Sequence, residues 1–120
     1  MNIKNFELEV DGTDMQADIV SDAVYVSRSF AFSAQLVFTG SPNGTLKVQA
    51  SLDDGAGEND LSNPTITNWT DVDSQSITSA GSHIFNLSDF GHRWIRIAWT
   101  DSSSGSPSTL TVYRANVKGI

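Results

Sequence analysis

The feature that most constrains this chain is the alternation of apolar and polar residues at every second position. Between residues 30 and 39, one side of an extended chain would carry only the apolar side chains Phe30, Phe32, Ala34, Leu36 and Phe38. Successive side chains of a strand point to opposite faces, so this rhythm predicts a strand with one buried face. No window shows the sustained i, i+3, i+4, i+7 apolar spacing of an amphipathic helix. The pattern therefore favours an all-β chain.

The same rhythm recurs in short segments along the sequence. Residues 45–52 place Leu46, Val48, Ala50 and Leu52 on one side, and the intervening turn 40–44 predicts a hairpin with residues 30–39. Further strands are predicted at residues 6–10, 14–19, 23–27, 66–72, 75–78, 83–87, 93–100 and 109–118. A change of phase between Val112 and Tyr113 predicts a bulge or a twist. About eight to ten short strands indicate an antiparallel β-sandwich of the jelly-roll-like kind.

Length indicates one domain over residues 1–120, because 120 residues suit a single core. Within it, residues 1–20 alternate apolar with acidic side chains and carry only one basic residue, Lys4. Such a segment is typical of a soluble edge strand, and it would serve equally as an arm that adds to a neighbour's sheet. Both interpretations stay open at this point.

Charge and composition exclude several classes of partner. The formal net charge is -7, from 14 acidic and 7 basic residues, and the basic residues are scattered. A field of this sign repels phosphate backbones, so we expect no nucleic-acid partner. The start resembles no signal peptide and no apolar run approaches the ~20 residues that span a bilayer, so we expect no membrane insertion. The chain has no cysteine, which excludes disulfides, thiolate metal sites and a Cys nucleophile.

Candidate catalytic and metal-binding residues are few. His83 and His92 lie in no metal-ligand spacing, and we interpret both as surface residues at strand edges. No G-x-S-x-G motif is present. The segment 53–60 holds Asp53, Asp54, Glu58 and Asp60 beside glycines, which favours a solvated loop and leaves a cation site as the alternative. We expect no enzyme activity, no catalytic residue, no cofactor and no metal.

The tryptophans carry the binding hypothesis. Trp94 and Trp99 would lie on opposite faces of one strand, and the face of Ile95, Ile97 and Trp99 is assigned to the core. Trp94 and Arg96 share the other face, and these two are the predicted partner-binding residues, because Trp beside Arg is typical of interfaces. The alternative is a strand whose second face is covered by a loop of the same chain. Trp69 is predicted to be a core anchor.

Residues 32–119 resemble small virion structural proteins of tailed bacteriophages. The resemblance rests on FSAQLVFTGSPNGTLKVQASLDDG, NWTDV and ITSAGSHIFNLSDFGHRWIRIAWTDSSSGSPSTLTVYRANVKG. The matching residues are Gln35, Thr39, Gly40, Val48, Gln49, Ala50, Ser51, Asp53, Gly55, Trp69, Thr70, Asp71, Gly91, Arg93, Trp94, Ile95, Arg96, Lys118 and Gly119. The same elements are also similar to discoidin-type carbohydrate-binding sandwiches. The chain departs from both patterns by a long insertion between Asp54 and Trp69.

The resemblance implies a β-sandwich located in the virion and assembled in the bacterial host cytoplasm. The leading expectation is a capsid decoration or cementing protein that binds the assembled shell. Its partners would be the major capsid protein or other virion proteins, and further copies of itself in a homo-oligomer such as a trimer. The alternative is a carbohydrate-binding module on a tail or fibre, with a glycan as its partner.

Overall fold

The computed structural model describes residues 2–6, 14–26, 29–53, 66–88, 93–102 and 107–119. Within these ranges the chain forms strands, turns and loops but no helix, which confirms the all-β prediction. The strands of the described ranges are β1 (Asn2–Phe6), β2 (Ile19–Val20), β3 (Val24–Tyr25), β4 (Ser29–Gly40), β5 (Gly44–Ser51), β6 (Thr70–Ile77), β7 (Gly81–Ser88), β8 (Trp94–Asp101) and β9 (Ser108–Gly119).

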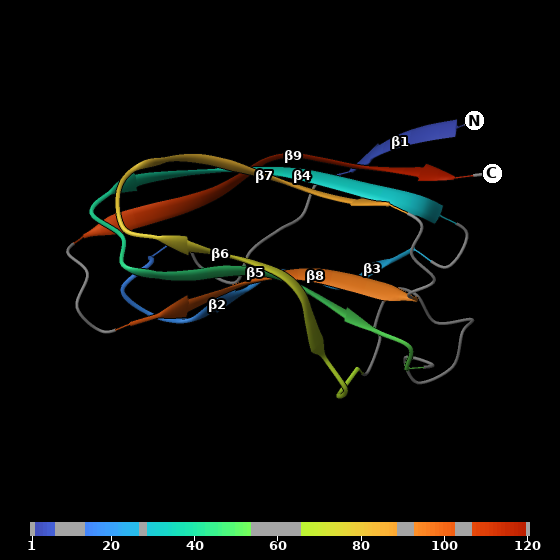
Figure 1. Ribbon diagram of the computed structural model, residues 1–120, viewed down its shortest axis with the longest axis horizontal. Coiled ribbons are helices and arrows are strands. Elements are labelled where there is room, and N and C mark those ends of the chain that lie inside the picture. The colour runs from blue at the N-terminus through green and yellow to red at the C-terminus, as the bar shows by residue number, and fades with distance from the viewer. Residues whose placement is uncertain are drawn as a thin grey trace.

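The strands form two antiparallel sheets that pack face to face (Figure 1). One sheet has the order β1-β9-β4-β7, and the other has the order β2-β8-β5-β6, with β3 also beside β8. Because β2 and β3 follow each other along one edge of β8, they act as a single interrupted strand. Each sheet then has four strands, and every connection except β5–β6 crosses between the sheets, as in a jelly roll. The predicted sandwich is confirmed.

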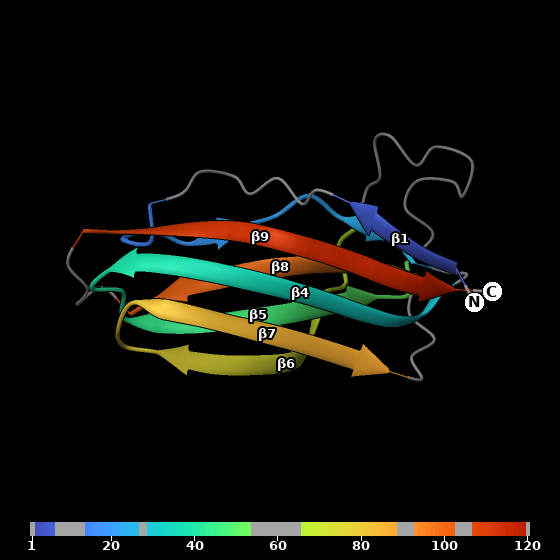
Figure 2. The same cartoon turned by 90° about the horizontal axis from the view of Figure 1, so that it is seen from above.

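The core lies between the two sheets, whose strands run in similar directions when seen from above (Figure 2). Its buried side chains include Phe32, Ala34, Leu36 and Phe38 of β4, Leu46, Val48 and Ala50 of β5, and Ile95, Ile97 and Trp99 of β8. The alternation had assigned all of these to the core, so that prediction is confirmed. Leu52 is the exception, because β5 ends at Ser51 and the Leu52 side chain is 67% exposed.

The connection between β4 and β5 does not form the predicted hairpin. β4 pairs with β7 and β9, whereas β5 pairs with β6 and β8, so the turn carries the chain from one sheet to the other. Gly40 begins this crossing with a φ of 81°, and a Cβ atom there would clash with the carbonyl oxygen of Pro107. Alternation identifies the buried face of a strand but not its neighbour, which is why the hairpin prediction was wrong.

A bulge interrupts β9 at the predicted position. Gln35 of β4 lies opposite Arg114, and the next residue, Leu36, lies opposite Val112, so Tyr113 is the extra residue. The bulge keeps Leu110 inward on one side of it and Ala115 inward on the other, although they are five positions apart and an odd spacing puts residues of a regular strand on opposite faces. The phase change in the sequence is therefore explained.

The segments predicted as two short strands, 66–72 and 75–78, instead give the single strand β6. Residues 66–69 precede the strand as a loop, and Val72 is an extra residue in its pairing with β5, between Asp71 and Asp73. β6 forms an edge of its sheet, and all of its residues except Ile77 are exposed. An edge strand buries little of its inward face, so its alternation in the sequence is weak.

The N-terminal part of the chain contributes an edge strand. β1 pairs with β9 of its own chain, from Asn2 opposite Gly119 to Phe6 opposite Ala115, so the two ends of the chain lie together (Figure 1). Residues 7–13 lie outside the described ranges. The prediction of a strand over 14–19 was wrong. Asp14 forms an isolated bridge with Thr109, β2 begins only at Ile19, and a turn lies between the two. Met15 is nevertheless buried in the core.

Candidate functional site

Trp94 lies on the outward side of β8 and is nevertheless fully covered by its own chain. Its side chain is 0% exposed. The Tyr25 ring packs edge-on against it with 5.0 Å between ring centres, and the indole Nε1 donates a hydrogen bond to the carbonyl oxygen of Asp53 at 3.0 Å. A buried indole N–H needs such an acceptor. The alternative interpretation, in which the second face of the strand is covered by the same chain, therefore holds for Trp94. This residue offers no free surface to a partner.

Arg96 lies two residues further along the same side of β8 and is half-buried. Its Nε donates a hydrogen bond to Oε1 of Gln49 at 2.8 Å. Its Cζ atom lies 4.4 Å from the centre of the Trp69 ring. A guanidinium over an indole is attracted by the ring's electron density. Burial lowers the pKa of Arg96 below its ordinary value, yet an arginine stays protonated in proteins.

The polar contacts of Arg96 continue across the sheet. Gln49 of β5 lies opposite both Arg96 and Asp71, and its Nε2 donates to Oδ1 of Asp71 at 2.8 Å. The other carboxylate oxygen of Asp71 lies 3.5 Å from Nζ of Lys47. We call these five residues, Lys47, Gln49, Trp69, Asp71 and Arg96, the Arg96 face. They come from β8, β5, β6 and the loop before β6, which side-by-side strands bring to one surface.

Asp53, two residues after the end of β5, binds the chain just before β6. Its Oδ2 accepts hydrogen bonds from the backbone N–H groups of Thr67 at 2.8 Å and Asn68 at 2.9 Å, and its Oδ1 accepts one from Nδ2 of Asn68 at 2.8 Å. These hydrogen bonds lower the pKa of Asp53 from 3.8 to about 2. The bonds from Asn68 contribute most to the shift, and those from Thr67 contribute less. The carboxylate thus fixes the chain just before Trp69.

Residues 54–60, which carry the rest of the predicted acidic loop, lie outside the described ranges. Over the part of the chain that the structure describes, no three His, Cys, Asp or Glu side chains come together to hold a metal ion. His92 also lies outside these ranges. His83 lies on the edge strand β7, half-buried, with its ring edge-on to Phe85 and 4.6 Å between ring centres.

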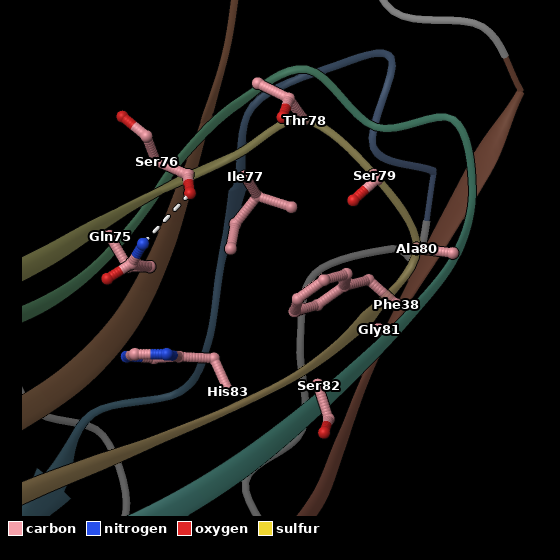
Figure 3. Close-up of a pocket in the computed structure, with 10 residues that line it drawn as sticks. All are labelled: Phe38, Gln75, Ser76, Ile77, Thr78, Ser79, Ala80, Gly81, Ser82 and His83. Atoms are coloured by element: carbon pink, nitrogen blue, oxygen red, sulfur yellow. Dashed lines mark hydrogen bonds between the residues drawn. The ribbon is translucent and has the colours of Figure 1, made fainter.

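A pocket of about 240 Å³ lies between the two sheets at the turn from β6 to β7 (Figure 3). Phe38 and Ile77 supply its apolar side, while Gln75 and His83 lie together on the other side. The side-chain amide of Gln75 donates to the carbonyl oxygen of Ser76 at 3.2 Å. The pocket therefore combines a small apolar floor with hydrogen-bonding groups.

A second pocket, of about 350 Å³, lies beside the beginning of β6. Ala50, Leu52, Asp53, Asn68, Thr70 and Val72 are among its lining residues. Trp94 and Arg96 line neither of these two pockets, and the Arg96 face lies on the opposite side of β5 from Ala50. The described pockets and the predicted partner-binding residues are thus separate features.

Sequence reasoning selected Arg96 as a candidate but did not select the four residues that lie beside it. Trp69 was predicted to be a core anchor, whereas it is half-buried on the outer side and lies outside the core cluster. Trp69 and Asp71 share a face at a spacing of two, which is the one signal that could have linked them. Their alignment with Gln49 and Arg96 depends on strand order and register, which the sequence does not carry.

Among the described residues, no helix has the length and apolar character needed to cross a bilayer. No protein-family model matches the sequence, and no curated protein matches it significantly.

Solved structures share the fold. Chitosan-binding module 1 of a chitosanase/glucanase from Paenibacillus sp. IK-5 is 16% identical, with 93% of this chain and 93% of that chain covered and a TM-score of 0.50. The SPBc2 prophage-derived protein YomS is 10% identical, with 98% and 95% covered and a TM-score of 0.50. The K3 cleaved adhesin domain of Lys-gingipain from Porphyromonas gingivalis is 9% identical, with 84% and 63% covered and a TM-score of 0.53. The β-sandwich fold is thus shared with carbohydrate-binding, prophage and adhesin proteins, and at these identities the likeness concerns the fold alone.

Proposed function

We propose that this chain is a structural module of a bacteriophage particle that binds the assembled capsid shell through the Arg96 face. The observation that carries the proposal is the stack of Arg96 on Trp69, presented at the outer side of a sheet and bordered by a polar row. Trp and Arg are the side chains most enriched at the energetic centres of protein interfaces. Polar groups around such a centre are typical of an interface rim.

The Arg96 face is held in place before any partner binds. Arg96 is fixed by the Trp69 ring and by Gln49, and Asp53 anchors the chain just ahead of Trp69. Ordering a long side chain on binding costs about 0.5–1.5 kcal/mol, so an arginine that is already ordered loses less. Its bond to Gln49 uses Nε alone among the five guanidinium N–H donors.

The same stack favours a protein over a glycan at this face. A sugar ring binds an aromatic side chain by lying flat against it, and the Arg96 guanidinium occupies one face of the Trp69 ring. An arginine over an indole instead offers a protein partner both charge and planar apolar surface. The proposal therefore assigns the Arg96 face to a virion protein.

The proposed mechanism is mass action rather than catalysis. A protein that binds the assembled lattice but not its free subunits stabilises that lattice. The resemblance of residues 32–119 to virion structural proteins supports the phage setting. A net charge of -7 suits a module present in many copies, because it discourages non-specific association.

The test is to mix the purified protein with capsids that lack it and to sediment the particles. We expect the protein to co-sediment with the shells and to raise the temperature at which they open. A protein that stays in the supernatant and leaves shell opening unchanged would rule the proposal out.

A carbohydrate-binding module on a tail or fibre is the second candidate, and the pocket in Figure 3 is the observation that favours it. Gln75 and His83 offer hydrogen-bonding groups beside the Phe38 ring, which is the mixture that fixes a small hydroxylated ligand. A volume of about 240 Å³ suits one sugar unit better than a drug-sized ligand. A glycan array tests this candidate: binding lost in Gln75→Ala supports it, and an array without hits counts against it.

A further inference from the structure

Strand β7 is an open sheet edge with none of the features that normally prevent strand pairing. It pairs with β4 through eight consecutive residue pairs, from Phe38 opposite Gly81 to Ala31 opposite Ser88, with no register shift. Among the described strands it has no neighbour on its other side, and Figure 2 shows it as the outermost strand of its sheet. Alternate residues therefore present backbone N–H and C=O groups outward.

The sequence of β7 also lacks the residues that prevent an edge strand from pairing. Its sequence, GSHIFNLS, contains no Asp, Glu, Lys, Arg or Pro, although the chain as a whole carries a net charge of -7. Ile84 at its centre points to the outer face and is 53% exposed. A long, regular, uncharged edge with an exposed apolar residue is the kind of edge that pairs with another chain.

The edge strand of the other sheet, β6, is guarded. Val72 forms a bulge in its pairing with β5, and Asp71 and Asp73 flank that bulge. Bulges and charged side chains are two of the devices by which natural edges avoid pairing. The two edges on this flank of the sandwich therefore differ in the property that controls strand addition.

The two remaining edges are guarded by other means. β2 and β3 have two residues each and are separated by residues 21–23, so they offer no continuous edge. β1 has only five residues, and a short edge strand is another device by which natural edges avoid pairing. Of the four described edges, only β7 is long, regular and uncharged.

We propose that β7 is a homodimer interface at which a second copy of this chain adds its own β7 in antiparallel register. A strand that pairs antiparallel with its own copy forms an isologous, two-fold contact. Directly opposed residues lie on the same face, so a register centred on Ile84 sets Ile84 against Ile84 of the second copy and Ser82 against Asn86. The exposed apolar residue is then covered, and no charged side chains of the two β7 strands meet although each copy is acidic.

The occupant is a second copy because the edge is self-complementary and neutral, so the general repulsion between two acidic chains is weakest there. The two four-stranded sheets would join into one continuous sheet. The proposal does not depend on the capsid or glycan hypotheses. A two-fold dimer also differs from the trimer expected from the sequence, and solution mass distinguishes them.

The test is sedimentation equilibrium of the purified full chain over a concentration series, with Ile84→Lys and Leu52→Lys as matched variants. Leu52 is 67% exposed and lies outside β7, so Leu52→Lys adds the same charge elsewhere. We expect the wild type and Leu52→Lys to reach twice the 12.9 kDa chain mass, while Ile84→Lys stays at 12.9 kDa. Circular dichroism checks that each variant keeps its β-sheet spectrum.

Hydrogen exchange supplies a second readout that does not need a variant. We expect alternate amides of β7 to become protected as concentration rises, while the outward amides of β6 do not. A wild type that stays at monomer mass throughout, a trimer, or protection of β6 in place of β7 would each overturn the proposal.

Discussion

The guanidinium of Arg96 lies over the Trp69 ring on the outside of one sheet, and Arg114 lies over the Tyr113 ring on the outside of the other. The Cζ-to-ring-centre distances are 4.4 Å and 5.1 Å. Among the described residues, the first pair alone connects to a hydrogen-bonded row, which runs through Gln49. The molecule therefore carries two arginine–aromatic pairs on opposite surfaces, and one is a natural control for the other.

We predict that Arg96→Ala weakens binding to the capsid shell, whereas Arg114→Ala leaves it unchanged. Both variants remove one positive charge and one arginine–aromatic contact, so net charge does not separate them. Loss of a residue at an interface centre costs about 2 kcal/mol or more, which is more than tenfold in affinity. Binding isotherms by co-sedimentation measure the difference. Equal losses in both variants would show that charge alone, and not the Arg96 face, controls binding.

Trp94 is predicted to act on stability through its contacts with the chain. Trp94→Ala should lower the free energy of unfolding by about 3–5 kcal/mol, because it removes a fully buried ring. Trp94→Phe keeps most of the ring and loses the N–H that binds the carbonyl oxygen of Asp53, which should cost about 1–3 kcal/mol. Urea denaturation measures both values. A change within experimental error for Trp94→Ala would contradict the burial of this side chain.

The hydrogen bonds that join Asp53 to Thr67 and Asn68 should respond to acid. Its pKa is about 2 in the folded chain against an ordinary 3.8, so the ionised carboxylate favours folding above pH 3.8. That contribution is lost as the pH falls from 3.8 through about 2. The amide signals of Thr67 and Asn68 in nuclear magnetic resonance spectra should shift with the same midpoint, and Asp53→Asn should abolish the shift. A midpoint at 3.8 would contradict the hydrogen bonds assigned to Asp53.

The break between β2 and β3 gives another prediction. Ser21 is buried there, its backbone N–H donates to the carbonyl oxygen of Ile97 at 2.8 Å, and its Oγ accepts from the Ile97 N–H at 2.8 Å. The hydroxyl thus replaces a backbone acceptor at the interruption. Ser21→Ala should destabilise the chain by about 1–3 kcal/mol, because the buried Ile97 N–H loses its partner. Ser21→Thr keeps the hydroxyl and is the control; thermal unfolding that ranks the two variants equally would contradict this role.

Most of the fold follows from alternation alone, because strand faces with a period of two depend on local sequence. The inward faces of β4, β5 and β8 and the bulge at Tyr113 were all predictable in this way. The connections between strands were not predictable from alternation. The turn after Gly40 has the composition of a hairpin turn, yet both sides of β4 are occupied by other strands, and this is set by long-range pairing.

The candidate site shows the same division between local and long-range information. Arg96 could be selected because its strand has one apolar and one mixed face. Trp94 shares that mixed face but is covered by Tyr25 and the chain at Asp53, segments that are distant in sequence. Trp69 has the composition of a core residue, and only the register of β6 against β5 and of β5 against β8 places it beside Arg96.

Electron microscopy of intact particles would test the central claim most directly, by locating the domain and the surface that it turns toward the shell. We predict that the outer side of the β5–β6–β8 sheet contacts a capsid protein and that Arg96 and Trp69 lie inside the contact. Density that places the domain on the shell with this surface facing solvent would contradict the account, and so would particles in which the domain is absent from the shell.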